Sequence, residues 1–255
     1  MKTNAFDQKL FYMDYTWKEL EAMDRARVTL VIPCGSIEEH GPHLPVSTDT
    51  LQAEQFCQLA ARQVKDVLIL PALCYTPAPD TSNYTGTIHI PPMVFLEMTV
   101  AILTSLNSNG FKKIILANVH GAVKTTLDVA IREFHTRLGV PGRPFNDDCK
   151  VHLQNLYVPA TAYLNSIAEG RDWGHACEME TSACLYLQPE VVRMELAQDD
   201  YLNWQNGLTW PIEDMRAANK SGIHGAATKS SAEKGRKVTD AIINAFVEVL
   251  RAFAL

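Results

Sequence analysis

Apolar and polar residues alternate along the chain in blocks that predict strands and helices in turn. Short apolar runs that end in Gly, Pro or polar residues predict buried strands at 27–34, 67–70, 113–118 and 151–158. Apolar residues at helical spacing predict helices at 51–64, 95–106, 124–137, 176–187 and 238–253. This order predicts an α/β fold with a mostly parallel central sheet and helices on both of its faces.

Two stretches lack a regular period. Residues 75–92 form a long excursion rich in Pro, Gly and Thr, and long irregular loops in compact domains are usually functional. The region around Trp204 and Trp210 is also irregular. Because the chain shows no internal repeat and no linker, we expect residues 1–255 to form a single domain.

Composition narrows the class of protein. The chain has 255 residues, and its 47% apolar content is sufficient for a substantial core. It contains no apolar run of membrane-spanning length and no signal-peptide pattern, and its six cysteines form no Cys-x-x-Cys pair, so we expect a soluble cytoplasmic protein. The net charge of −6 comes from mixed signs without a basic run, which favours a small-molecule substrate over nucleic acid.

The loop that follows the first strand contains most of the metal-ligand-type residues. Glu38 and His40 are two residues apart, so in extended backbone their side chains can converge, and Asp49 can approach them from beyond Pro45. His120 lies just past the end of another strand, at the same edge of a parallel sheet. A mixed set of nitrogen and oxygen donors favours Zn²⁺ or Mn²⁺ over Ca²⁺. Helix capping is the structural alternative for this set.

His43 lies in the same loop, and we expect it only to hydrogen-bond the backbone. Another group of polar residues lies between Trp173 and Ser182. If a helix begins near Ala176, Glu178 lies in its first turn, where the helix dipole favours a carboxylate. Equally, His175 could be a proton donor beside Glu178 as a metal ligand, in a partly apolar cavity. The residues alone leave both interpretations open.

Four blocks of the chain resemble the signature of the creatininase family of creatinine amidohydrolase-like enzymes. They follow the family's order, and the first and last are specific. The blocks are residues 33–49, Gly86–Ile88, Asn118–Gly121 and His175–Ser182. The resemblance covers about residues 15–240 and implies a three-layer α/β/α sandwich, two divalent metal ions that we expect to be Zn²⁺ and/or Mn²⁺, and assembly into a homo-oligomer, commonly a hexamer.

Carried over residue by residue, the resemblance implies that Glu38 and His120 bind one ion, that His40 binds the other, and that Asp49 bridges both. In creatininase a Glu two residues after the strand-end His completes the site, and Ala122 occupies that position here. In other members a Glu in the final block takes this place.

Glu178 matches that Glu of the final block, and His175 matches the family's proton-transfer histidine. Two departures concern the substrate. The substrate-contacting Ser of a Tyr-Gly-x-Ser run is absent from Tyr-Thr-Pro-Ala at 75–78, and His-Gly-Gly-Asn becomes His-Gly-Ala-Val at 120–123. Losing polar contacts from a pocket built around them changes specificity strongly, so we do not expect creatinine itself as the substrate.

The sequence therefore predicts a binuclear metal hydrolase. A metal-bridged hydroxide would attack a carbonyl of a small cyclic amide or related ring, and His175 would donate a proton. One alternative is a hydrolase of the same family that cleaves a C–C bond of a cyclic polyol ketone. Another is a metal- or ligand-binding homologue without turnover. A dinucleotide-binding protein is disfavoured because no Gly-x-Gly-x-x-Gly follows the first strand.

Overall fold

A four-stranded parallel sheet forms the centre of the protein, whose computed structural model describes residues 9–137, 148–202 and 215–254. The strand order is β2-β1-β3-β4, and every neighbouring pair is parallel. The strands are β1 Thr29–Cys34, β2 Val67–Ile69, β3 Lys113–Asn118 and β4 Lys150–Asn155. All four expected strands are thus present, although β4 ends three residues earlier than predicted.

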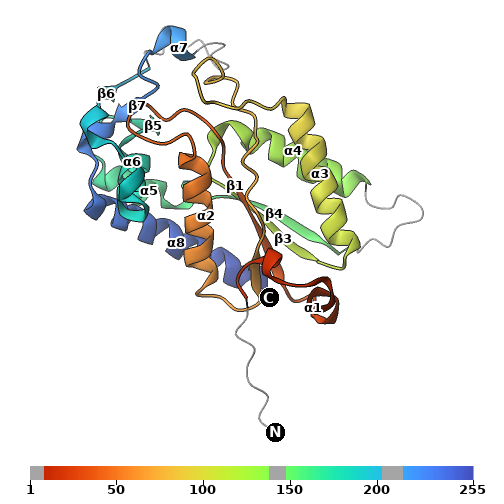
Figure 1. Cartoon of the computed structure of the whole chain (residues 1–255). Coiled ribbons are helices and arrows are strands. Elements are labelled where there is room, and N and C mark those ends of the chain that lie inside the picture. The colour runs from red at the N-terminus through yellow and green to blue at the C-terminus, as the bar shows by residue number, and fades with distance from the viewer. Residues whose placement is uncertain (1–8, 138–147, 203–214, 255) are drawn as a thin grey trace.

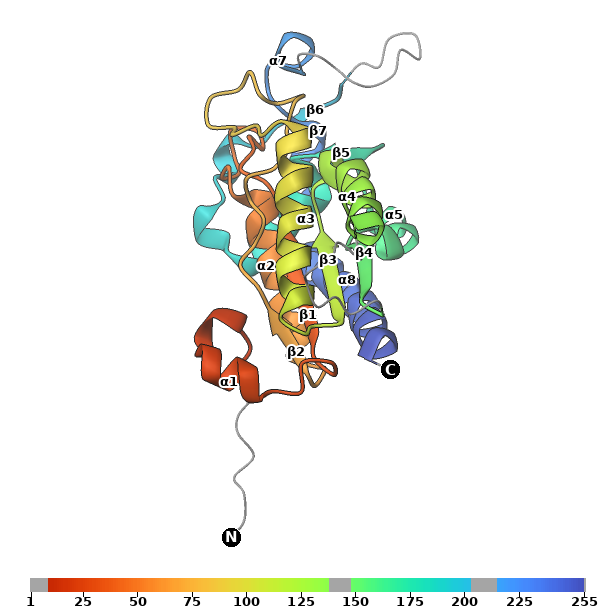
Figure 2. The same ribbon diagram turned by 90° about the vertical axis from the view of Figure 1, so that its right-hand side faces the viewer.

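Helices cover both faces of the sheet (Figure 1), with α2 and α8 on one side and α3 and α4 on the other. The turned view in Figure 2 shows the same layers from the side of α3. The helices are α1 Trp17–Ala22, α2 Thr48–Ala61, α3 Pro92–Ser108, α4 Lys124–Arg137, α5 Thr161–Ile167, α6 Glu178–Leu187, α7 Met215–Ala218 and α8 Ala232–Ala254. The expected α/β/α fold with a mostly parallel sheet is confirmed.

Two apolar cores hold these layers together because alternate residues of each strand face opposite sides. Val31 of β1 packs in the core that includes Phe56 of α2 and Phe246 of α8. Its neighbour Leu30 belongs to the other core, with Phe95 of α3. Burial on both faces explains why these strands read as continuous apolar runs in the sequence.

A second, three-stranded sheet lies beyond the carboxyl ends of β1 and β3 (Figure 1). Its antiparallel order is β5-β7-β6, with β5 Trp173–His175, β6 Asp199–Asp200 and β7 His224–Ala226. The sequence did not predict this sheet, nor α1, α5 or α7. Strand β5 of this second sheet brings His175 toward the edge of the central sheet.

Some sequence-based expectations are not decided by this fold. Trp204 and Trp210 lie outside the described residues. The single-domain organisation stays a prediction. Across residues 9–137, 148–202 and 215–254, no helix combines the length and apolar character that crossing a bilayer requires.

Candidate metal centre

A glycine holds the loop after β1 against the start of α2. A Cβ atom on Gly35 would lie 2.5 Å from the backbone N and Cα of Thr50, so only glycine allows this close approach. The hydroxyl of Thr50 also donates to the carbonyl oxygen of Ser36, at 2.8 Å. The polar loop therefore stays beside Asp49, which lies in the first turn of α2 and not ahead of the helix as the sequence pattern suggested.

β3 brings His120 to the same place. Because β1 and β3 are neighbouring parallel strands, their carboxyl ends coincide, and Cys34 pairs with Asn118. The Asn118 side-chain amide donates to the carbonyl oxygen of His120 at 2.9 Å, and its Oδ1 accepts the His120 N–H at 3.2 Å. These bonds fix the backbone of His120 just beyond the sheet edge.

Five side chains form one cluster at this edge. Its members fall into groups whose candidate ligand atoms lie within 4.8 Å of one another. One group contains Glu38, Asp49 and His120, and another contains His40, Asp49 and Glu180. Asp49 belongs to both groups, which is the arrangement expected of a carboxylate shared by two ions.

The ring nitrogens and carboxylate oxygens of the cluster lie close together without hydrogen-bonding. His120 Nδ1 is 3.1 Å from Glu38 Oε2 and 3.0 Å from Asp49 Oδ2. His40 Nε2 is 3.2 Å from Asp49 Oδ1. Even so, His40 Nε2, Glu38 Oε2 and Asp49 Oδ2 have no hydrogen-bond partner among the described residues. We attribute this to the angles between the groups, which do not suit a hydrogen bond.

Both histidines of the cluster donate an N–H to a backbone carbonyl. His40 Nδ1 lies 3.1 Å from the carbonyl oxygen of Glu38, and His120 Nε2 lies 2.8 Å from that of Pro77. A carbonyl oxygen only accepts, so these nitrogens carry protons, and His40 Nε2 and His120 Nδ1 are the nitrogens that can offer a lone pair to a cation once deprotonated. Metal-binding histidines are typically fixed by an outer hydrogen bond of this kind.

Burial and charge set the protonation of the cluster when no cation is bound. Burial disfavours the imidazolium of His40, but the charge of Asp49 outweighs it and raises the pKa of His40 to about 10. Burial likewise disfavours the carboxylate of Glu38, but the charge of His120 outweighs it and lowers the pKa of Glu38 to about 2. Protons and divalent cations therefore compete for the same ring nitrogens.

The donor set fits Zn²⁺ or Mn²⁺. It combines two imidazole nitrogens with three carboxylates, a mixture that these ions accept and that Ca²⁺, which prefers oxygen alone, does not favour. Four of the five side chains, those of Glu38, His40, Asp49 and His120, are at most 5% exposed. The ligand atoms of these side chains are buried and lie close together, so a bound cation would provide a common partner for them.

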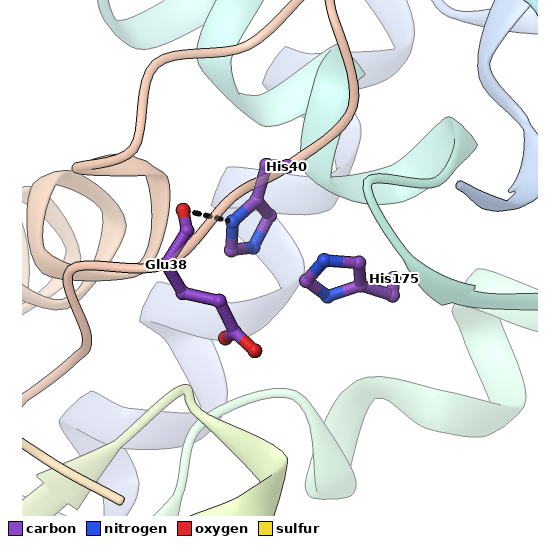
Figure 3. Close-up of side chains that lie close together, drawn as sticks. All are labelled: Glu38, His40 and His175. Atoms are coloured by element: carbon purple, nitrogen blue, oxygen red, sulfur yellow. Dashed lines mark hydrogen bonds between the residues drawn. The ribbon is translucent and has the colours of Figure 1, made fainter. Parts of the chain in front are cut away.

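His175 of β5 lies beside this cluster and forms a further group with Glu38 and His40 (Figure 3). Its Nε2 is 2.8 Å from the carbonyl oxygen of Glu39 and 3.2 Å from Glu39 Oε1. Nε2 therefore carries a proton, and Nδ1 is the nitrogen that can exchange one. Burial and the charge of His40 act to lower the pKa of His175, but the hydrogen bond to Glu39 and the charges of Glu38 and Glu39 raise it on balance.

Glu178 is not part of the cluster, which differs from the expectation. Its carboxylate is fully buried, accepts the backbone N–H groups of Glu169 and Gly170 at 3.0 and 2.9 Å, and forms an ion pair with Lys234. Lys234 belongs to α8 and is 9% exposed. As the first residue of α6, Glu178 faces α8 and joins that helix to the 169–170 loop.

Glu180 takes the position that we expected of Glu178. Two residues along a helix turn a side chain by about 200°, so Glu180 faces the cluster where Glu178 faces away. Its Oε2 also accepts the Cys177 N–H at 3.3 Å, and burial raises its pKa. The sharp turn at Ala176, whose φ is +50°, sets the direction of this first helical turn.

Two other polar residues of the loop have specific partners. His43 Nε2 pairs with the hydroxyl of Thr181 on α6 at 2.8 Å, whereas we expected a backbone partner. Burial and the charge of His40 lower the pKa of His43 to about 4. Glu39 received no role from the sequence, because nothing in the pattern indicated that β5 would bring His175 against it.

A cavity of about 760 Å³ opens over the cluster. His175 and four of the five cluster residues (Glu38, Asp49, His120 and Glu180) line one part of it. Other walls come from the second sheet, including Trp173 and His224, and from Asp80 and Thr81 of the irregular loop. The size matches that of sites for small molecules.

The chain matches a known family over nearly its whole length. The family described as Creatininase, creatinine amidohydrolase, matches residues 13–250. Similar proteins include the 3-dehydro-scyllo-inosose hydrolase of Thermotoga maritima, 25% identical over 95% of this chain and 83% of the relative. Another is the mycofactocin precursor peptide peptidase of Mycobacterium tuberculosis strain H37Rv, 26% identical over 85% of this chain and 82% of the relative.

Solved creatininases share the fold. A structure described as the Mn form has a TM-score of 0.80 with 23% identity, and one described as a Zn-Zn type mutant has a TM-score of 0.81 with 22% identity. Each comparison covers 96% of this chain and 98% of the other. Identities this low are consistent with a protein that is distinct from creatininase itself.

Proposed function

The chain belongs to the creatininase family, and on this basis we propose that it is a hydrolase with two divalent metal ions that opens a small cyclic amide. The observation that carries the proposal is the pair of ligand groups that share Asp49. Both groups contain buried ligand atoms that lack hydrogen-bond partners within the described part of the chain, which is expected of side chains that bind cations.

We assign Glu38 and His120 to one ion, His40 and Glu180 to the other, and Asp49 to both. Zn²⁺ and Mn²⁺ are the candidate ions, and solved family members with these metals support the choice. When bound, the two ions would supply a water of lowered pKa and would polarise the substrate carbonyl.

Residues of this chain supply the remaining chemistry. His175 holds a proton that it can deliver from Nδ1 to the leaving nitrogen, because Nε2 is committed to Glu39. The hydroxyl of Thr81 donates to Glu38 Oε1 at 2.5 Å and so orients that carboxylate. Trp173 contributes an aromatic surface to the cavity wall.

A second candidate reaction is hydrolytic cleavage of a C–C bond in a cyclic polyol ketone. It is favoured by the relative named 3-dehydro-scyllo-inosose hydrolase. The third possibility, a binding protein without turnover, requires fewer than two bound ions. One relative is named as a hydrolase and another as a peptidase, so an assay has to distinguish between these reactions.

Family resemblance also supports a homo-oligomer, and we propose a hexamer acting on a small molecule in the cytoplasm. Exposed apolar side chains on α3, Met93 and Val94, offer surface for such assembly. Measuring the mass of the protein in solution tests this point, and a monomer would contradict it.

The test of function combines metal analysis with a substrate panel. Protein purified without chelator should contain two equivalents of Zn or Mn by elemental analysis. Lactams, formamides and cyclic diketones assayed in parallel should show ring opening of a lactam. Two ions together with turnover of the diketones alone would select the C–C reaction. Fewer than two ions and no turnover would contradict a hydrolase.

A further inference from the structure

The irregular loop at 75–92 places one carboxylate in the cavity that the metal centre does not explain. Asp80 is 8% exposed and lines the cavity. It belongs to none of the groups of possible metal ligands found among the described residues. Its Oδ1 is buried and has no hydrogen-bond partner within the described part of the chain.

The backbone around Asp80 is fixed on both sides. Its carbonyl oxygen accepts the N–H of Met215 at 3.0 Å, so the residue is tied to the start of α7. The next residue, Thr81, is held by its hydrogen bond to Glu38. The backbone of Asp80 is therefore held close to the proposed metal centre, and its side chain lies in the cavity wall.

A buried carboxylate oxygen without a donor is costly, and such groups in native proteins are usually satisfied by water or by a ligand. Glu38 and Asp49 also have unpartnered oxygens, but both lie next to Nδ1 of His120 and face the proposed cations. Asp80 has no such neighbour in a ligand group. A ligand group that satisfies it can enter through the cavity, which Asp80 lines.

We propose that Asp80 is a specificity-determining residue that accepts a hydrogen bond from an amino or hydroxyl group of the substrate, and that it prefers a cationic amine. The substrate class is then a small ring with a hydrogen-bond donor away from the bond that is cleaved. An ammonium group is favoured over a hydroxyl because a charge-assisted hydrogen bond to a carboxylate is the stronger one. This inference rests on the proposed function only in placing the reacting bond at the metal centre.

Three lactams of equal ring size test the inference: pyrrolidin-2-one, 4-hydroxypyrrolidin-2-one and 4-aminopyrrolidin-2-one. Dissociation constants are measured by calorimetry on the full-length protein with His175→Ala, which is expected to keep both ions and to slow turnover. The Asp80 variants are made in the same background, and wild type here means Asp80 in that background. The wild type should bind the amino lactam at least about tenfold more tightly than the unsubstituted one, with the hydroxy lactam between them, because one hydrogen bond to a charged group supplies roughly this factor.

Two variants show whether Asp80 is the cause. Asp80→Asn removes the charge, and Asp80→Leu removes the acceptor at similar volume. In both, the preference for the amino lactam should fall to within about threefold of unity, since the charge-assisted bond is lost. Asp24→Asn, on the exposed surface, makes the same charge change and should keep the preference. Metal content should match the wild type in all three variants.

The outcomes separate this inference from the proposed function. If an Asp80-dependent preference is found although no lactam is hydrolysed, the inference stands and the proposed reaction is wrong. If two ions bind and a lactam is opened, but the preference is absent or survives in Asp80→Leu, the inference alone is overturned. Failure of all three lactams to bind the wild type would also overturn it.

Discussion

His120 Nδ1 lies 3.0 Å from Asp49 Oδ2, yet that oxygen has no hydrogen-bond partner in the described part of the chain. The outer hydrogen bond from His120 to Pro77 turns the ring so that Nδ1 faces the cluster. A nitrogen and an oxygen this close, without hydrogen-bond geometry between them, are oriented toward a third partner. We identify that partner with the proposed cations.

Asp49 is the residue on which both ions should depend. Asp49→Ala removes the only carboxylate that belongs to both ligand groups, so we expect loss of both ions and at least a thousandfold loss of activity, on the order of what metal catalysis contributes. Elemental analysis and kcat/KM measure these effects. Asp128→Ala, on the exposed side of α4, is the control and should retain both. Two equivalents of metal in Asp49→Ala would rule out the bridging role.

Substitutions of Glu178 and Glu180 should have different effects, one on stability and the other on metal binding. Glu180→Gln is expected to lower the metal content while leaving the free energy of unfolding nearly unchanged. Glu178→Gln breaks a buried ion pair with Lys234, so it should cost about 3 kcal/mol of that free energy and keep the metal stoichiometry. Urea denaturation and elemental analysis of the two variants provide both readings. The reverse pattern would return the ligand role to Glu178.

Metal affinity should rise with pH because each ion displaces protons. The pKa of His40 is raised from 6.5 to about 10, so a proton has to leave its ring before a cation binds. We expect the affinity for Mn²⁺ to increase by up to about tenfold per pH unit for each proton displaced between pH 6.5 and 8.5. Titration against a competing chelator at several pH values measures this, and a flat profile would contradict it.

The metal-free protein should be most stable near pH 4.5 to 6.5. The raised pKa of His40 means that its protonated form stabilises the fold below pH 6.5, and this contribution is lost as the pH rises toward 10. The pKa of Glu38 is lowered from 4.5 to about 2, so its contribution is present above pH 4.5 and is lost as the pH falls. Thermal unfolding after chelation should show this maximum, which saturating metal should shift toward higher pH.

His175 should act in turnover and not in metal binding. His175→Ala is expected to keep both ions and to lower kcat by about 10² to 10⁴, the usual contribution of a positioned proton donor. His135→Ala, at an exposed position of α4, controls for the loss of an imidazole and should retain wild-type kcat. Unchanged kcat in His175→Ala would exclude the proton-donor role.

Glu39→Gln tests how His175 is held. The Glu39 charge and hydrogen bond raise the pKa of His175, and the substitution removes that charge while keeping an acceptor oxygen. With a lower pKa, His175 loses the proton that it donates at a lower pH, so the alkaline limb of the kcat/KM profile should move to lower pH. An unchanged limb with unchanged metal content would show that Glu39 has no influence on the donor.

The central sheet was predictable because three of its strands, β1, β2 and β3, are buried on both faces. Continuous apolar runs such as Val28–Ile32 have no other stable location, and parallel strands bring their carboxyl ends to one edge. That rule places the loop after β1 and His120 at the same edge of the sheet. Asp49 joins them because Gly35 lets this loop approach the start of α2 closely.

The second sheet and the identity of the ligand on α6 were not predictable in this way. Strands β5 and β6 have three and two residues, which is too short for any period to be visible, and β5 pairs with β7 some 50 residues later. Whether Glu178 or Glu180 faces the cluster depends on the turn at Ala176, whose positive φ leaves no signature in the sequence. Both features concern directions of short segments, which local composition does not encode.

The two cores that hold the layers contain none of the five residues assigned to the cations. Because apolar packing holds the layers together, we expect the chain to fold without a bound cation and to bind its ions afterwards. The identity of the bound ions would then depend on the metal supply in the cell. Protein produced in zinc-rich and in manganese-rich medium should therefore have the same fold and differ only in the metal that it binds.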